Sequence, residues 1–418
     1  MEAIQEIIAQ AEEELRGAFS EIDENEEVRT RQILDVFRRE EVSYRHFSPS
    51  SGYGYDDIGR DTLERIYSGI FHTEAALMRP HISSGTSALS LTLFGLTKPG
   101  ENIISATGMP YDTLQSVIGI GRKKTPGSLK DNGIGFEEIG LRNGQIDIQA
   151  VDAAITKNTT LVIAQRSRGY AWRPSLFPDA FDELADMIHR KHPGVILMVD
   201  NCYGEFVCRD EPTDHGADLC VGSLIKNPGG GIAPTGGYIA GSLEAVERIA
   251  GRLTAPGLGR EIGSYEGSYR PFYQGLFMAP HTVAQALKTV LLFSRVFSMF
   301  GFETSPAFNE KRADIVQAVK LNSAERLVAF CQGIQTASPV DSMSVPEPWD
   351  MPGYDDKVVM AAGTFVAGAS IELSADGPIR PPYTVYLQGG LTYTHGKIAL
   401  SESLRKMLET GSLRLNKP

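Results

Sequence analysis

Short apolar segments that alternate with helical stretches are the feature that most restricts how this chain folds. Clear apolar segments occupy residues 102–105, 160–164, 195–199 and 219–222. Such runs are typical of strands that are buried on both faces of a sheet. Helical stretches such as 179–191 lie between several of them. This alternation predicts an α/β fold with a mostly parallel sheet covered by helices on both faces.

Polar residues stand at or just after the ends of these predicted strands. They are Tyr111, Gln165, Asp200 and the segment from Ser223 to Lys226. Functional sites in open α/β sheets lie beyond the carboxyl ends of the strands. We therefore expect these side chains to belong to one site.

Asp200 and Lys226 are the most specific pair within that set. Asp200 ends the run Val-Ile-Leu-Met-Val-Asp, and Lys226 follows in Gly-Ser-Leu-Ile-Lys-Asn-Pro-Gly-Gly-Gly. A lysine can form a Schiff base with the aldehyde of pyridoxal 5'-phosphate (PLP), while a carboxylate keeps the pyridine nitrogen protonated. The alternatives are a capping or loop carboxylate and a solvated lysine, but an apolar strand and a glycine run are unusual neighbours for a surface lysine. Partial desolvation near a cationic ring is expected to lower the lysine pKa.

The segment Ile-Ser-Ser-Gly-Thr-Ser, residues 82–87, reads as a turn that opens an apolar helix. Free backbone N–H groups at a helix start attract anions. Gly85 permits close approach, and the hydroxyls of Ser84 and Thr86 add donors, so this segment is a candidate phosphate site. Ser223 is a further candidate for the phosphate. By itself, the segment also reads as an ordinary helix cap.

Four other residues have two readings each. Tyr111 is predicted to stack on the cofactor ring or to pack a turn. Tyr55 and Arg60, in a turn-rich loop, either reach a phosphate across a subunit interface or are solvated. Arg380 has the planar fork that suits a substrate carboxylate, and its alternative is a structural ion pair.

Composition restricts the class of protein. The net charge of −12 argues against nucleic acid or an anionic membrane as a general partner. The four cysteines form no C-x-x-C pair, and no apolar run long enough for a membrane span or signal peptide is visible, so we expect a cytoplasmic protein. His189 and His192 are near each other without a third ligand in sequence, and no metal site is predicted.

The chain of 418 residues exceeds the size that a single core usually supports. We expect N-terminal helices and an interface loop at 1–74, a large cofactor-binding domain at 75–280, and an interdomain helix with a small α+β domain at 281–418. Two helices are expected before residue 40, with a break near Asp23. Residues 251–280 are expected to be irregular, followed by a helix from His281 to about residue 300.

Several motifs in order resemble the PLP-dependent aluminium-resistance or methionine gamma-lyase-like proteins, relatives of the cystathionine and methionine lyases. The resemblance covers nearly the full length. It rests on segments 52–61, 109–114, 199–206, 222–231, 233–239, 378–380 and 388–393.

This resemblance implies the fold-type I, aspartate aminotransferase-like architecture, in a homodimer or homotetramer with shared active sites. It implies Lys226 as the Schiff-base lysine, Asp200 at the pyridine nitrogen and Tyr111 over the ring. It also places Gly85, Thr86 and Ser223 on the phosphate, with Tyr55 and Arg60 from the neighbouring subunit, and Arg380 on the substrate carboxylate.

We therefore predict a PLP-dependent lyase that eliminates a thiol from a sulfur-containing amino acid of the methionine, cystathionine or cysteine type. Two segments depart from the better-known lyases, 165–169 and the stretch after Lys226, and both flank the substrate pocket. The alternatives are another fold-type I enzyme, such as an aminotransferase or racemase, and a non-catalytic metal-stress protein.

Overall fold

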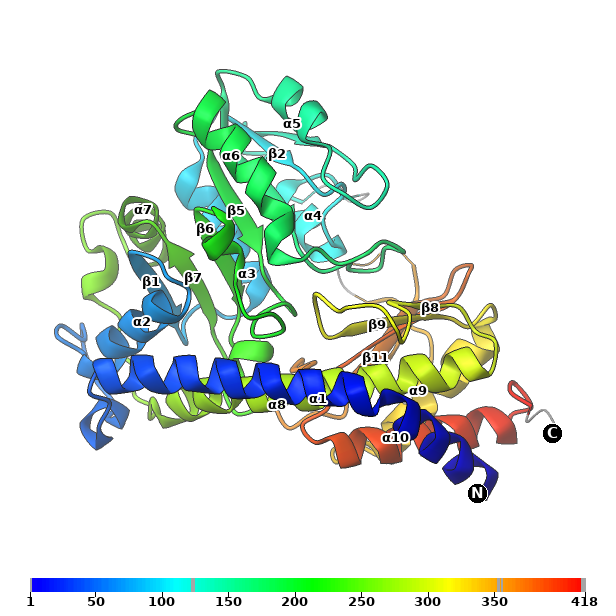
Figure 1. Cartoon of the computed structure of the whole chain (residues 1–418). Helices are drawn as coiled ribbons and strands as arrows, with labels where there is room; N and C mark the ends of the chain where they lie inside the picture. Colours follow the sequence, from blue (N-terminus) through cyan, green and yellow to red (C-terminus); the bar gives the residue numbers. More distant parts are fainter. Residues whose placement is uncertain (1, 122–124, 352–353, 355, 415–418) are drawn as a thin grey trace.

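The computed structural model describes residues 2–121, 125–351, 354 and 356–414, and it contains two sheets joined by long helices (Figure 1). The larger sheet has the strand order β1-β7-β6-β5-β4-β2-β3. Strands β2 to β6 run parallel, and β7 is antiparallel to both of its neighbours. The strands are β1 (Ala75–Arg79), β2 (Asn102–Ser105), β3 (Gly135–Glu138), β4 (Thr159–Gln165), β5 (Ile196–Asp200), β6 (Leu219–Ser223) and β7 (Gly237–Gly241).

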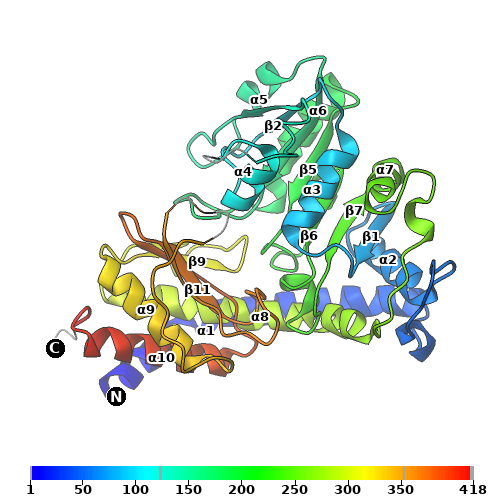
Figure 2. The same ribbon diagram turned by 180° about the vertical axis from the view of Figure 1, so that it is seen from behind.

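Helices cover both faces of this sheet. One face packs against α2, α5 and α6, and the other against α3, α4 and α7, as the two opposite views show (Figure 2). Strand side chains alternate between the two cores: Val162 and Ala164 of β4 point to the first, Leu161 and Ile163 to the second. The helices are α2 (Ile58–Ile70), α3 (Gly85–Leu96), α4 (Asp112–Ile118), α5 (Ile148–Ala154), α6 (Asp182–Lys191) and α7 (Leu243–Leu253). The predicted α/β architecture and its four named strands are confirmed.

The smaller sheet is antiparallel, with the order β10-β11-β12-β9-β8. Its apolar side chains form a separate core with α9, α10 and the start of α1. The elements are β8 (Thr304–Ser305), β9 (Val316–Lys320), α9 (Ala324–Ala337), β10 (Val358–Ala361), β11 (Ser374–Pro378), β12 (Thr384–Gln388) and α10 (Tyr393–Glu409). Short 3-10 helices are η1 (Tyr44–Phe47), η2 (Pro178–Phe181), η3 (Pro212–His215), η4 (Asn227–Gly229) and η5 (Gly259–Glu261).

The N-terminal region is one helix, α1 (Glu2–Arg39), so the predicted break near Asp23 is wrong. This helix lies along α8 (Arg270–Met299) beneath both sheets (Figure 1). The acidic stretch lies against α8, where Asp23 pairs with Lys288 and Glu26 lies 2.7 Å from His281. The stretch predicted to break the helix is therefore part of a helix–helix contact.

Helix α8 starts at Arg270, eleven residues before the predicted start at His281. The expectation of an irregular segment at 251–280 is therefore wrong for its last part, and Pro280 lies inside the helix. Buried apolar side chains between Phe272 and Leu287 belong to the core of the large domain, and the helix lies along α1. Its length and hydropathy would also suit a membrane span, but 72% of its most apolar stretch is buried inside the protein. That burial is what a core helix shows.

Candidate active site

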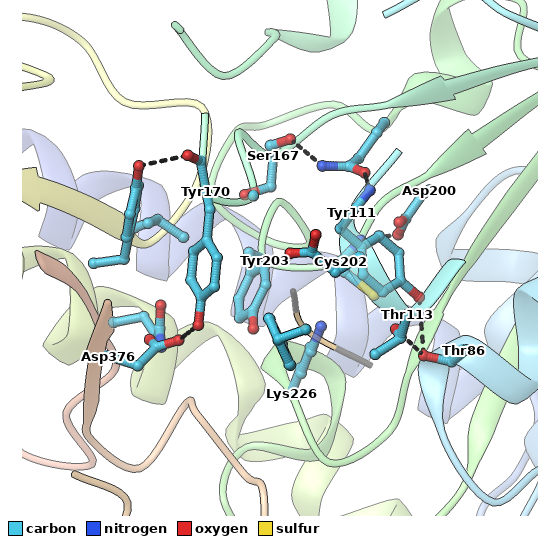
Figure 3. Close-up of a pocket in the computed structure, with 17 residues that line it drawn as sticks. Thr86, Tyr111, Thr113, Ser167, Tyr170, Asp200, Cys202, Tyr203, Lys226 and Asp376 are labelled. Atoms are coloured by element: carbon cyan, nitrogen blue, oxygen red, sulfur yellow. Dashed lines mark hydrogen bonds between the residues drawn. The ribbon is translucent and has the colours of Figure 1, made fainter. Parts of the chain in front are cut away.

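A pocket of about 300 Å³ opens where the carboxyl ends of the parallel strands face the smaller sheet (Figure 3). Its first wall comes from the large sheet and from the start of α3, and its second wall from β9, β11 and β12. The lining residues are Thr86, Tyr111, Asp112, Thr113, Gln165, Ser167, Gly169, Tyr170, Asp200, Cys202, Tyr203, Lys226, Val316, Tyr354, Asp376, Tyr386 and Gln388.

Lys226 follows β6 in the turn before η4, and its Nζ lies 3.9 Å from the ring centroid of Tyr203. The side chain reaches into the pocket, as predicted from its place after a strand. Burial disfavours the ammonium form, but the acidic groups nearby, among them Asp200, outweigh burial and raise the lysine pKa well above its ordinary value. The lowered pKa expected for this lysine beside a cationic cofactor ring stays a prediction.

Asp200 is the last residue of β5 and is buried at the other side of the same pocket. One carboxylate oxygen accepts a hydrogen bond from the backbone N–H of Cys202 at 3.1 Å. Burial raises the pKa of Asp200, while the Lys226 charge opposes that shift. The two side chains line the same pocket and form no direct ion pair with each other (Figure 3).

The start of α3 and the end of β6 form a candidate anion site next to the pocket. Ser84 caps the helix, its Oγ accepting from the N–H of Ser87 at 3.0 Å. A Cβ at position 85 would stand 3.2 Å from the Cβ of Ser223, so glycine allows the β6 end to approach the helix start. Free N–H groups beside two hydroxyl side chains are a suitable anion site. The structure thus brings Ser84, Gly85, Thr86 and Ser223 together.

Tyr111 lies over this region, with its hydroxyl 3.0 Å from Oγ1 of Thr86. That same Thr86 oxygen lies 3.1 Å from Oγ1 of Thr113. The backbone N–H of Tyr111 donates to Oε1 of Gln165 at 3.0 Å, which ties the tyrosine to the end of β4. Burial raises the pKa of Tyr111, so the phenol keeps its proton. A protonated phenol in the pocket is able to act as a proton donor.

Six predicted residues are not among those that line the pocket. Ser84, Gly85 and Ser223 belong to the start of α3 and the end of β6 described above, whereas Tyr55, Arg60 and Arg380 lie elsewhere. The Arg60 guanidinium donates to the carbonyl of Gly54 at 2.8 Å and pairs with Asp61. Tyr55 is 59% exposed and stacks on Tyr53 with ring centroids 5.6 Å apart. Within one chain, neither residue reaches the phosphate region, and their proposed role depends on a neighbouring subunit.

Arg380 forms an ion pair with Asp356 at 2.6 Å, and half of its side chain is exposed. It follows β11, on a turn at the edge of the second wall. Burial raises the pKa of Tyr386, a pocket residue, to about 12, and the charges of Arg168 and Arg380 oppose that rise. The structure therefore shows the ion pair that the sequence offered as the alternative, and the role of Arg380 at the substrate carboxylate stays a prediction.

The second wall of the pocket was not assigned from the sequence. Tyr170 donates a short hydrogen bond to one oxygen of Asp376, and Nε2 of Gln388 donates to the other at 3.2 Å. The hydroxyl of Tyr386 donates to the carbonyl of Tyr170 at 2.7 Å. In the sequence, the segment 388–393 supported the family resemblance, but no role was predicted for its residues.

A buried ion network holds the strand end that carries Asp200. Glu211 pairs with Arg29 of α1 and lies 3.6 Å from the guanidinium of Arg166. The same carboxylate accepts from the amide of Asn201 at 2.9 Å, one residue after Asp200. The position of Asp200 thus depends on side chains from α1 and from the β4 end.

Comparison with known proteins gives consistent matches along the chain. The family model described as methionine gamma-lyase matches residues 4–408. The Bacillus subtilis protein YnbB is 47% identical over 409 residues, covering 98% of this chain and 97% of YnbB. A solved structure from Clostridium novyi NT, named as a carbon-sulfur lyase involved in aluminum resistance, is 46% identical with a TM-score of 0.93, covering 97% of this chain and 96% of its own.

A more distant structure supports the fold alone. The PLP-dependent protein YhfS from Escherichia coli has a TM-score of 0.62 at 15% identity, covering 93% of this chain and 97% of YhfS. With the sheet order described above, this likeness confirms the predicted fold-type I architecture.

Proposed function

Because this chain belongs to the methionine gamma-lyase family of PLP-dependent carbon–sulfur lyases, we propose that it eliminates a thiol from a sulfur-containing amino acid, leaving a keto acid and ammonia. One observation carries the proposal. Asp200, at the end of β5, and Lys226, in the turn after the adjacent parallel strand β6, face the same pocket without pairing with each other. That separation suits a cofactor ring with an acid at one end and an amine at the other.

The residues present fit PLP at both of its ends. Ser84, Gly85, Thr86 and Ser223 would hold the phosphate at the start of α3, and Asp200 would contact the pyridine nitrogen. When bound, PLP supplies an electron sink that stabilises negative charge at the substrate α-carbon. A carboxylate beside the ring nitrogen favours the protonated ring and so strengthens that sink.

The remaining steps belong to residues of this chain. The Lys226 amine would be free to take the α-proton after the substrate amine has taken its place on the cofactor. The lysine lies in the pocket and forms no ion pair with the described residues there. Tyr111 is the proposed donor of a proton to the departing sulfur, because burial keeps its phenol protonated. Tyr203 places its ring face 3.9 Å from the lysine Nζ.

The proposed site also needs a second subunit. We expect a homodimer or homotetramer in which Tyr55 and Arg60 approach the phosphate of a neighbouring subunit. The exposed Tyr53–Tyr55 stack offers apolar surface for such a contact. Arg380 is proposed to exchange Asp356 for the substrate carboxylate, since both are carboxylate partners of one guanidinium.

Replacement of Lys226 tests the proposed function. The wild-type protein loaded with PLP is expected to absorb visible light and to release keto acid from thioether amino acids. Lys226→Ala should lose keto-acid release, whereas Lys357→Ala, a change at an exposed lysine, should not. Full activity of Lys226→Ala would exclude this lysine as the catalytic amine.

The same assay separates elimination from the other fold-type I reactions. Elimination yields thiol and ammonia without an added keto-acid acceptor. An aminotransferase would yield keto acid only with an acceptor, and a racemase would yield the opposite enantiomer and no keto acid. Either result, with no thiol released from any thioether, would replace the proposed function.

A further inference from the structure

The second wall of the pocket carries a buried carboxylate that the reaction described above does not use. Asp376 belongs to β11, is 7% exposed and lines the pocket. Its two hydrogen-bond donors, Tyr170 and Gln388, are both neutral. Within residues 2–121, 125–351, 354 and 356–414, no lysine, arginine or histidine forms an ion pair with it.

A carboxylate in this position is costly unless a cation accompanies it. Burial of an unpaired charge is strongly unfavourable, and neutral donors offset only part of that penalty. Each carboxylate oxygen can accept about two hydrogen bonds. Tyr170 contacts one oxygen and Gln388 the other, so each keeps an acceptor position for a ligand in the pocket.

The aromatic rings around Asp376 also favour a cation. Tyr170 stands between Tyr354 and Tyr386, with ring centroids 5.6 Å and 5.1 Å away. Faces of tyrosine rings attract cations, most strongly in sites shielded from water. Lys226 is the only basic residue among those that line the described pocket, and the proposed cofactor would engage it. Arg380, at the edge of this wall, is already paired with Asp356. The far end of the pocket therefore favours a positive group.

We propose that Asp376 is a specificity-determining residue that binds an ammonium group on the sulfur side of the substrate. The preferred substrate class would be thioether amino acids that carry a second amine beyond the sulfur. An apolar tail, such as the methyl group of methionine, would remove water from the carboxylate and give it no partner. This inference rests on the proposed function, because the amine leaves with the thiol and takes no part in bond breaking.

Substrate pairs that differ only at the distal end give a direct test. S-(2-aminoethyl)-L-cysteine carries the amine, and S-propyl-L-cysteine replaces it with a methyl group of similar size. The corresponding homocysteine thioethers cover γ-elimination. Loss of one charge-assisted hydrogen bond predicts a preference of about tenfold to a hundredfold in kcat/KM for the amine. The readout is keto-acid release by the PLP-loaded wild-type enzyme.

The variant Asp376→Asn should abolish this preference, mainly by slowing the amine substrate. Asn keeps an acceptor for Tyr170 or Gln388 and removes the charge. The matched control is Asp350→Asn, which changes an exposed aspartate that lies 3.9 Å from Lys357. It should keep the wild-type preference.

The preference should also depend on pH. Burial raises the pKa of Asp376 to about 6, opposed by its bonds to Tyr170 and Gln388. The other titratable groups that sense Asp376 are Tyr170, Tyr354, Tyr386 and Cys331, and all have raised pKa values and stay neutral. Protonation of Asp376 below about pH 6 should therefore reduce the preference for the amine, while the propyl substrate keeps its own profile.

Each result is decisive. Equal kcat/KM values for the two members of a pair would overturn the role of Asp376 and leave the lyase function standing. If no thioether is cleaved, the lyase function fails, and the two ligands are compared by calorimetric binding to the PLP-loaded wild-type protein. A tighter amine ligand there would still support the Asp376 site, and equal affinities would refute it.

Discussion

Replacement of Glu211 by Gln should destabilise the protein far more than replacement of Glu27, an exposed glutamate on α1. Glu211 is fully buried, pairs with Arg29 and lies 3.6 Å from a guanidinium nitrogen of Arg166. Its carboxylate also accepts from the N–H of Phe206 at 3.0 Å. The Glu211→Gln change would keep one acceptor oxygen but remove the charge, leaving two buried guanidinium groups without an anion.

The magnitude follows from the burial of these partners. Removal of one member of a buried ion pair costs about 3–5 kcal/mol. For 418 residues, the entropy of unfolding is about 0.9 kcal/mol/K. If the chain unfolds as one unit, the midpoint of thermal unfolding should fall by about 3–6 °C.

Scanning calorimetry at one protein concentration measures this shift. The control is Glu27→Gln, which breaks the exposed pair of Glu27 with Arg31 at 2.8 Å on α1. Exposed pairs of this spacing are worth about 0.3–0.5 kcal/mol, which is a shift below about 1 °C. Because Asn201 bonds to Glu211, the Glu211→Gln variant should also bind PLP more weakly. Equal midpoints for the two variants would refute the network as a stabilising element.

Three further changes test individual residues of the site. Asp200→Asn should lower turnover by about tenfold to a thousandfold, because an adjacent carboxylate shifts the pKa of its cationic partner by about 1–3 units. Steady-state kinetics at saturating PLP measure the turnover, and a wild-type value would exclude a contact between Asp200 and the pyridine nitrogen. Tyr111→Phe should lower kcat by about a hundredfold while PLP stays bound, as expected for loss of a proton donor, and an unchanged kcat would assign the proton to another group. Arg380→Ala should raise KM at least about tenfold with little change in thermal midpoint, since its ion pair with Asp356 is exposed; equal KM values for Arg380→Ala and Asp356→Asn would favour a purely structural pair.

The fold was predictable where the pattern has one physical reading. Strands buried on both faces show as short apolar runs, and β2, β4, β5 and β6 lie where those runs occur. The N-terminal helix was misread because an acidic stretch is equally compatible with a solvated turn and with a face paired to distant cations. Here Lys288 supplies the cation and His281 is a second partner, both from more than 250 positions away, which local sequence does not reveal.

The site residues also differ in how far the sequence could predict them. Residues of the cofactor half follow strand ends of a parallel sheet, so topology alone brings Asp200, Lys226 and Tyr111 to one edge. The prediction for Arg380 rests on its chemistry alone, with no constraint from strand topology, and the structure shows it paired with Asp356. Residue type alone was thus a weaker guide than residue type at a strand end.

The substrate half depends on sheet register, which is why it escaped prediction. In the antiparallel pair of β11 and β12, Asp376 lies opposite Tyr386, and Ser374 lies opposite Gln388. Residues two apart on a strand share a face, so this register places all four side chains on the same side of the sheet. A shift by one residue would turn them away from the pocket. The acidic wall proposed to select an ammonium group therefore exists only because the strands pair in this register, and that is a property of the folded small domain rather than of any single motif.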